Sequence, residues 1–148
     1  MSQLSIFVGS VYGNAQHTAE TLQAKLSEQG IDSQLFTEPT LDDFSQAKSI
    51  LFVSSTTGDG EIPPNLEFFV YDLKDRFPLI TGVPFAVAAL GDSSYDHFCG
   101  AGDSIYDLLV ELQGEPVADT LKIDAIETLE PEKELLAWFA EIQDKLVR

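Results

Sequence analysis

The chain has 148 residues, which is typical of one domain and is enough to build a hydrophobic core without disulfide or metal support. Apolar residues make up 44% and charged residues 22% of the sequence, which excludes a disordered or low-complexity chain. The net charge is −17, because 8 Lys and Arg stand against 25 Asp and Glu; this disfavours binding to nucleic acid or anionic lipid and favours basic protein partners.

The number of cysteines and the length of the apolar runs indicate in which cellular compartment the chain works. The one cysteine, Cys99, cannot form a disulfide within the chain or supply a multi-thiolate site, so we expect no bound metal. No apolar run reaches the roughly 18 residues of a membrane span, and the first residues lack the charged start of an export signal. We therefore expect a cytoplasmic protein with no membrane contact.

The pattern of apolar residues predicts alternating strands and helices. Residues 4–9 form an apolar run typical of a buried strand, and Asn14 is expected to cap a helix that Gly30 ends. The apolar face of that helix consists of Ala15, Ala19, Leu22 and Leu26. Further strands are predicted at residues 32–37, 49–54, 84–90 and 117–123, with an irregular or briefly helical crossover at 39–48. Helices are predicted at residues 66–76, around Ile105, Leu108, Leu109 and Leu112 up to Gly114, and along Leu135, Phe139, Ile142 and Leu146.

This alternation predicts the fold class. The central strands are continuous apolar runs, which are typical of a parallel sheet covered on both faces. We therefore predict a single α/β domain spanning residues 1–148, a doubly wound five-stranded parallel sheet in a three-layer sandwich. Such sheets bind ligands beyond the carboxyl ends of their strands, so the loops after the first, third and fourth strands are the candidate site.

The first of these loops, residues 9–15, is a candidate anion site. It joins a strand to a helix N-terminus, where free N–H groups and the helix dipole favour a phosphate, and Ser10 and Asn14 add polar side chains. No Lys or Arg precedes Lys25, and the loop matches neither a Walker motif nor the dinucleotide fingerprint. The alternative is an ordinary tight turn before a capped helix.

The other two loops contain glycines and aromatic residues. In residues 54–65, two glycines near hydroxyl side chains allow a close backbone approach to a ligand, although a plain connector is the alternative. In residues 89–101, Tyr95 and Phe98 suggest a wall for a flat ring, with a core-filling role favoured for Phe98. His97 and His17 are interpreted as exposed single histidines, and Cys99 as a packed residue rather than a nucleophile.

Together the three loops carry a family resemblance. The segment Gly91-Asp92-Ser93-Ser94-Tyr95, followed by Phe98-Cys99-Gly100, resembles the flavin-flanking loop of the flavodoxins. Ser10-Val11-Tyr12-Gly13-Asn14 is similar to their FMN phosphate loop. Ser55-Thr56-Thr57-Gly58-Asp59-Gly60 is similar to their middle loop, and also to the flavin domain of diflavin reductases. The resemblance covers essentially the whole chain and implies a short-chain member with strand order 2-1-3-4-5.

The resemblance implies a bound FMN and single-electron transfer, with no substrate chemistry of the chain's own. It implies that the phosphate lies on the first loop, that Thr56, Thr57 and Gly58 face the inner side and N5 edge of the flavin, and that Tyr95 stacks on its outer face. It also implies a peptide flip at Thr57-Gly58. The complete set of implied cofactor-binding residues is Ser10, Val11, Tyr12, Gly13, Asn14, Ala15, Ser55, Thr56, Thr57, Gly58, Asp59, Gly60, Leu90, Gly91, Asp92, Tyr95, Phe98 and Cys99.

Two positions depart from the family pattern. Flavodoxins often have Trp or Tyr where Thr57 stands, so an inner aromatic wall is missing here. Tyr12 replaces a hydroxy amino acid of the phosphate loop, which leaves a role for its backbone and puts the role of its side chain in question.

The resemblance also implies partners. These are an NAD(P)H-dependent flavodoxin reductase and acceptor redox enzymes with basic docking surfaces, and the chain itself is expected to be a monomer. Residues 77–121 contain seven acids and no Lys or Arg, which should lower the flavin potential and steer basic partners. An FMN-dependent quinone-type reductase is the alternative function. A phosphorelay receiver is disfavoured, because acids are missing after the first strand and a phospho-accepting Asp is missing after the third.

Overall fold

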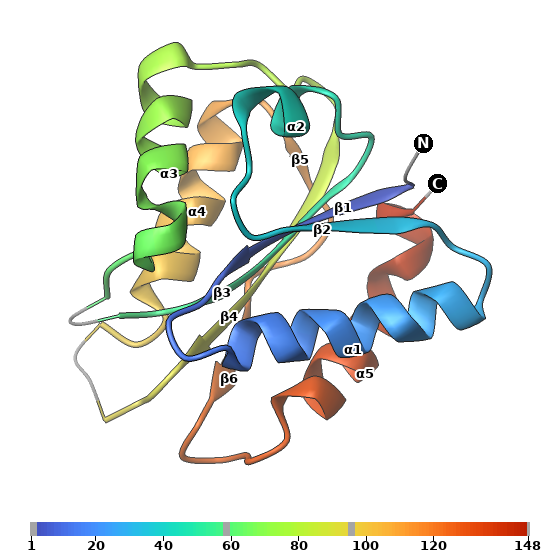
Figure 1. Cartoon of the computed structure of the whole chain (residues 1–148), viewed down its shortest axis with the longest axis vertical. Helices are drawn as coiled ribbons and strands as arrows, with labels where there is room; N and C mark the ends of the chain where they lie inside the picture. Colours follow the sequence, from blue (N-terminus) through green and yellow to red (C-terminus); the bar gives the residue numbers. More distant parts are fainter. Residues whose placement is uncertain (1–2, 58–59, 95–96, 148) are drawn as a thin grey trace.

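The computed structural model describes residues 3–57, 60–94 and 97–147, in which helices pack on both faces of a parallel sheet (Figure 1). This confirms the predicted fold class. The strands are β1 (Leu4–Gly9), β2 (Ser33–Phe36), β3 (Ile50–Ser55), β4 (Pro84–Gly91), β5 (Glu115–Pro116) and β6 (Leu121–Asp124). The helices are α1 (Asn14–Glu28), α2 (Leu41–Ser45), α3 (Pro64–Arg76), α4 (Gly100–Glu111) and α5 (Pro131–Leu146).

The strand order is β2-β1-β3-β4-β5, and β6 also pairs with β4. All pairs are parallel, so the carboxyl ends of β1, β3 and β4 lie at one edge. In this register Gly9 lies opposite Ser54, and Ser55 lies opposite Leu90. The loops after these three strands therefore emerge side by side.

The core has two halves, one on each face of the sheet. On one face α1 and α5 pack with residues such as Leu22 and Phe139, and on the other α3 and α4 pack with residues such as Phe69 and Leu109 (Figure 1). The second half contains a cluster of rings around Phe7, whose centroid lies 5.0 Å from that of Phe52. Apolar side chains on both faces of the central strands explain why their sequences are continuous apolar runs.

Two details differ from the prediction. The outer strand predicted at residues 117–123 is two pieces, β5 and β6, because Pro116 pairs with Phe85 whereas Leu121 pairs with Ala88. Four residues of the outer segment therefore lie opposite two residues of β4, and the ladder cannot continue through them. Asn14 is the first residue of α1 rather than its cap; the N-cap is Gly13, whose φ of 86° is in the left-handed region.

Within residues 3–57, 60–94 and 97–147, none of the helices is long and apolar enough to cross a membrane.

Candidate functional site

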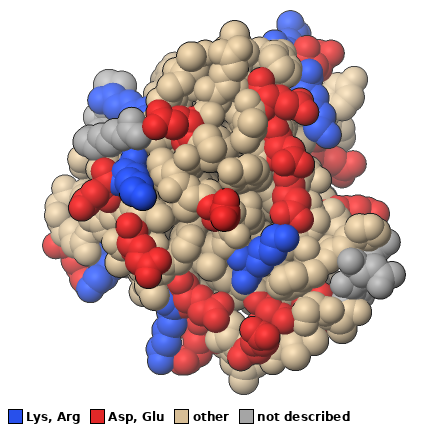
Figure 2. Space-filling model, turned by 180° about the vertical axis from the view of Figure 1, so that it is seen from behind, with Lys and Arg blue, Asp and Glu red and all other residues tan. Residues whose placement is uncertain are grey.

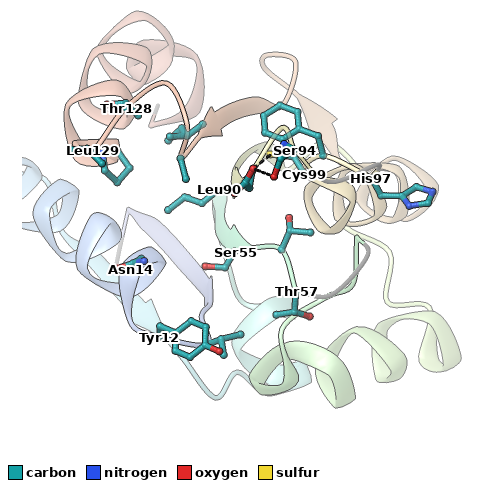
Figure 3. A pocket seen from close by; sticks show the side chains of 18 residues that line it. Tyr12, Asn14, Ser55, Thr57, Leu90, Ser94, His97, Cys99, Thr128 and Leu129 are labelled. Carbon is teal, nitrogen blue, oxygen red and sulfur yellow. Dashed lines mark hydrogen bonds between the residues drawn. The ribbon is translucent and has the colours of Figure 1, made fainter.

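A cleft of about 950 Å³ opens at the carboxyl edge of the sheet (Figure 3). Its walls come from the loops after β1, β3 and β4, as predicted, and also from the segment between β6 and α5. The size is in the range of roughly 300–1,000 Å³ that is usual for small-molecule and cofactor sites.

The structure brings most of the predicted site residues to this cleft. The predicted residues that line it are Val11, Tyr12, Asn14, Ser55, Thr56, Thr57, Leu90, Gly91, Asp92, Phe98 and Cys99. Four others lie near it without lining it: Ser10, Gly13, Ala15 and Gly60. Gly58, Asp59 and Tyr95 lie outside the described residues.

The first loop is held in place by Asn65, which the sequence analysis did not assign a role. Asn65 Oδ1 accepts a hydrogen bond from Ser10 N at 2.9 Å. Its Nδ2 donates to Val8 O at 2.7 Å and to Thr37 O at 2.9 Å. One side chain at the start of α3 therefore ties the end of β1, the first loop and the segment after β2 together.

The start of α1 is suited to an anion. Ser10 Oγ accepts from Gly13 N at 3.0 Å, and the first hydrogen bond of the helix runs from His17 N to Gly13 O. By helix geometry, the N–H groups of residues 14–16 have no intrahelical acceptor. The first turn contains no acidic residue, so the positive end of the helix dipole is not neutralised by the chain there.

Thr56 contributes a buried polar atom to the cleft. Its Oγ1 is buried and makes no hydrogen bond among the described residues, although the residue lines the cleft. A buried hydroxyl without a partner costs free energy, and a polar group of a ligand in the cleft would remove that cost. This observation fits a ligand with a phosphate or a hydroxylated chain.

The loop after β3 closes on itself and packs against the loop after β4. Thr57 N donates to Glu61 O at 2.8 Å, and Glu61 N donates back to Thr57 O at 2.7 Å. Gly60 has a φ of 94°, and a Cβ added there would lie 2.7 Å from the Cβ of His97. Only a glycine fits this position without displacing the neighbouring loop.

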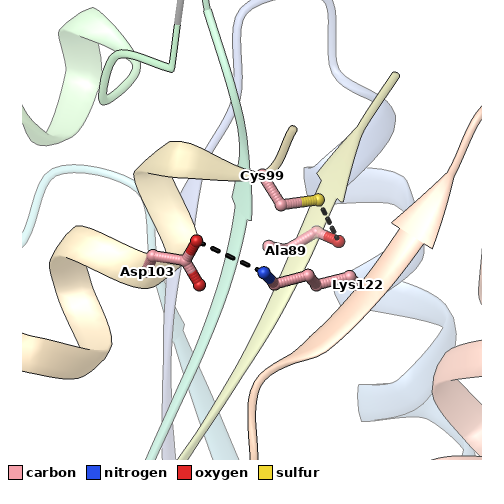
Figure 4. Close-up of polar contacts among 4 residues, drawn as sticks. All are labelled: Ala89, Cys99, Asp103 and Lys122. Atoms are coloured by element: carbon pink, nitrogen blue, oxygen red, sulfur yellow. Dashed lines mark hydrogen bonds and ion pairs between the residues drawn. The ribbon is translucent and has the colours of Figure 1, made fainter. Parts of the chain in front are cut away.

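The loop after β4 buries Cys99. The thiol donates to Ala89 O at 3.6 Å, beside an ion pair of Lys122 Nζ with Asp103 Oδ2 at 3.3 Å (Figure 4). Burial raises the pKa of the Cys99 thiol to about 12, against a lowering by Lys122. This confirms a packed residue rather than a nucleophile. Phe98, by contrast, is half-buried and lines the cleft, so its interpretation as a core-filling side chain is wrong.

Asp124, at the end of β6, is a further residue that the sequence analysis missed. Its Oδ1 accepts from Ser93 N at 3.2 Å and from Ile126 N at 3.0 Å. Hydrogen bonds from Ser93, and then from Ile126, hold the pKa of this carboxyl below its usual value. The carboxylate therefore connects the loop after β4 to the segment after β6.

That segment forms a cleft wall without any recognisable motif. The lining residues from the end of β6 to the start of α5 are Ile123, Ala125, Thr128, Leu129 and Pro131, and Ser94 and His97 join them from the loop after β4. A sequence signal was available in Leu129, an apolar loop residue that is 94% exposed in the structure.

Comparison with known proteins gives the same family that the three loops resemble. The Flavodoxin family model matches residues 6–138. The flavodoxin YqcA of Escherichia coli is 39% identical over 140 residues, covering 93% of this chain and 94% of its own. A solved cysteine-to-alanine mutant of the flavodoxin from Pseudomonas aeruginosa has a TM-score of 0.90 with 38% identity, covering 97% of both chains. The solved flavodoxin of Fusobacterium nucleatum, bound to flavin mononucleotide, has the same fold with a TM-score of 0.81 and 18% identity over 99% of both chains.

Proposed function

Because the chain belongs to the flavodoxin family, as a short-chain member that carries FMN and transfers electrons, we propose that it shuttles single electrons between an NAD(P)H-dependent reductase and acceptor enzymes with basic docking surfaces. It is an electron carrier rather than an enzyme. When bound, FMN supplies the redox chemistry. The chain binds it, orients it and sets the charge around it.

The observation that supports placing the cofactor in this cleft is that Thr56, whose hydroxyl makes no hydrogen bond among the described residues, lines the same cleft as Asn14 at the start of α1. The N–H groups of residues 14–16 would hold the phosphate, and Thr56 Oγ1 would donate to it or to the adjoining sugar chain. The loops after β3 and β4 would then flank the flavin ring, with Gly58, Asp59 and Tyr95 completing the set outside the described residues.

The charge around the cleft supports a basic partner. Glu61 stands on the loop after β3, Asp92 on the loop after β4, and Glu127 between two cleft-lining residues of the segment after β6. Figure 2 shows that carboxylates also outnumber Lys and Arg on the face opposite to that of Figure 1. Such a field attracts basic surfaces and speeds their association.

Titration of the apoprotein tests the cofactor site. We expect FMN to bind far more tightly than riboflavin, because only FMN has the phosphate for which the start of α1 is suited. The holoprotein should then accept electrons from a flavodoxin reductase and pass them to cytochrome c as a basic acceptor. Equal affinities for FMN and riboflavin would contradict the phosphate assignment.

A pair of double variants tests the docking charge. Glu61→Gln with Glu127→Gln removes two carboxylates at the cleft, and Glu141→Gln with Asp144→Asn removes two exposed carboxylates from the second half of α5. Net charge changes equally in both. We expect only the first pair to slow the reaction with cytochrome c at low salt, and the difference to vanish as salt screens exposed charges beyond about 8 Å. Equal slowing by both pairs would mean that net charge alone matters.

We propose that residues 1–148 form one FMN-binding unit that works as a monomer in the cytoplasm. A net charge of −17 supports the monomer, because like charges oppose self-association. The reducing cytoplasm suits a chain whose one cysteine stays a buried thiol.

A further inference from the structure

Tyr12 and Thr57 occupy equivalent places in neighbouring loops. Gly9 of β1 lies opposite Ser54 of β3, and each of the two residues stands three positions further along its own chain. Neighbouring strands are about 4.8 Å apart, so the loops start next to each other. Both residues line the cleft, and Figure 3 places their side chains on the same side of it, across from Ser94 and Cys99.

The side chains of Tyr12 and Thr57 differ in size and in exposure. Thr57 is small and half-buried, and its hydroxyl donates to Glu61 O at 3.3 Å, so it offers little surface to a flat ring. Tyr12 is 91% exposed. A Tyr at the rim of a ligand cleft has a large apolar face to bury and few rotatable bonds to restrict, so covering it with a ring is favourable.

We propose that Tyr12 packs its ring against the flavin of bound FMN, on the face next to the loop after β3, where Thr57 leaves the ring uncovered. This inference rests on the proposed function. The aromatic wall is then supplied by the phosphate loop instead of the loop after β3. Loop 9–15 contacts both ends of the cofactor, the phosphate through its backbone and the ring through Tyr12.

The alternative is that the Tyr12 hydroxyl serves the phosphate. Flavin binding to Tyr12→Phe and Tyr12→Ala separates the two roles, measured with both FMN and riboflavin. Stacking predicts that Tyr12→Phe binds both ligands as the wild type does. Tyr12→Ala should weaken both by a similar factor of about tenfold, because riboflavin has the same ring. It should also raise the fluorescence of the bound flavin, which a stacked ring quenches.

A second variant tests whether an aromatic side chain at position 57 can replace the ring of Tyr12. Adding Thr57→Trp to Tyr12→Ala should restore flavin affinity and quenching, since the aromatic side chain then stands on the other loop of the same wall. Tyr71→Ala is the matched control, because Tyr71 is also an exposed tyrosine (66%) but lies on α3 and does not line the cleft. It should leave flavin binding and fluorescence unchanged.

Three outcomes are distinguishable. Wild-type chain that binds no flavin would overturn the proposed function itself. Binding by the wild type with unchanged affinity and fluorescence in Tyr12→Ala would overturn the stacking role alone. Loss of FMN affinity in both Tyr12→Phe and Tyr12→Ala, without loss of riboflavin affinity, would assign the hydroxyl to the phosphate.

Discussion

Gly60 and Gly100 touch backbone to backbone: a Cβ added at Gly100 would lie 2.9 Å from both the Cα and the carbonyl oxygen of Gly60. This contact joins the loop after β3 to the start of α4, which follows the loop after β4. The spacing of the two loops that we propose to flank the flavin therefore depends on the absence of two side chains.

Gly100→Ala should move these loops apart. A Cβ in so tight a contact with backbone atoms forces a shift that costs about 1–3 kcal/mol, and we expect weaker FMN binding and altered one-electron potentials. Isothermal titration and a spectroelectrochemical titration measure both. Ser104→Ala, at an exposed position of α4, controls for the higher helix propensity of Ala. Unchanged affinity and potentials in Gly100→Ala would show that the loops are not coupled through this contact.

Thr56→Val separates binding from stability. Replacing an unpartnered buried hydroxyl by a methyl should stabilise the apoprotein by about 1 kcal/mol, whereas losing the donor should weaken FMN binding by about five- to tenfold. Ser33→Ala is the control, because Ser33 Oγ is also buried without a partner among the described residues but belongs to β2 and does not line the cleft. It should raise stability and leave FMN affinity unchanged. Thermal unfolding and FMN titration are the measurements, and a Thr56→Val chain with wild-type affinity would remove Thr56 from the site.

Asn65→Ala should damage both the fold and the site. It leaves Ser10 N, Val8 O and Thr37 O without their partner, at a cost of about 1–3 kcal/mol for each group that stays buried. We expect a lower unfolding free energy in urea and weaker FMN binding. Asn65→Asp keeps the acceptor for Ser10 N, but it sets a carboxylate oxygen against the carbonyl oxygens of Val8 and Thr37 and adds negative charge beside the anion site, so it should bind FMN more weakly than Asn65→Ala. Wild-type FMN affinity in Asn65→Ala would contradict a role for Asn65 in placing the first loop.

The apolar pattern predicts the central strands better than it predicts the outer strand. The strands β1, β3 and β4 were predicted to within one residue at either end, because an apolar run buried on both faces has no other stable arrangement. The outer strand was predicted wrongly, because its interruption depends on how many residues of β4 it faces. The number of β4 residues that the outer segment faces is set by the strand register, which cannot be deduced from the pattern of apolar residues.

The position of the cleft was predictable where glycines and hydroxyl residues follow a strand. It was not predictable at Asn65, whose partners Val8 and Thr37 are 57 and 28 residues away along the chain. Asp124 was missed for the same reason, since its link to Ser93 crosses 31 residues. Such residues acquire their roles only when the strands are placed side by side.

Asp124→Asn should change stability in a pH-dependent way. Hydrogen bonds from Ser93 and Ile126 hold the pKa of Asp124 below its unfolded value of about 3.9. Its charged form therefore stabilises the fold above that pH, and the contribution is lost as the pH falls through the folded pKa. The wild type should be more stable than Asp124→Asn at pH 7 and closer to it at pH 3, by urea unfolding. Asp119→Asn, at an exposed carboxylate, is the control, and a gap for Asp124→Asn that stays constant with pH would contradict the prediction.

Cys99 should be unreactive in the native chain. With a pKa of about 12 and a fully buried side chain, the thiol stays protonated at pH 8 and out of reach of iodoacetamide. Mass spectrometry should find alkylation only after unfolding in urea. A surface cysteine, Ser104→Cys in a Cys99→Ala background, is the positive control. Alkylation of native Cys99 at the rate of that control would show that the loop after β4 opens readily.

The interruption between β5 and β6 also determines how the sheet ends. An unbroken outer strand presents a row of N–H and C=O groups on which another chain can add a strand. Here that edge consists of the two-residue strand β5 and the four-residue strand β6, which are separated by residues 117–120, and β5 contains Pro116, which has no N–H to offer. Lys122 adds a charge to β6. This edge of the sheet is therefore a poor template for edge-to-edge aggregation with a second copy of the chain.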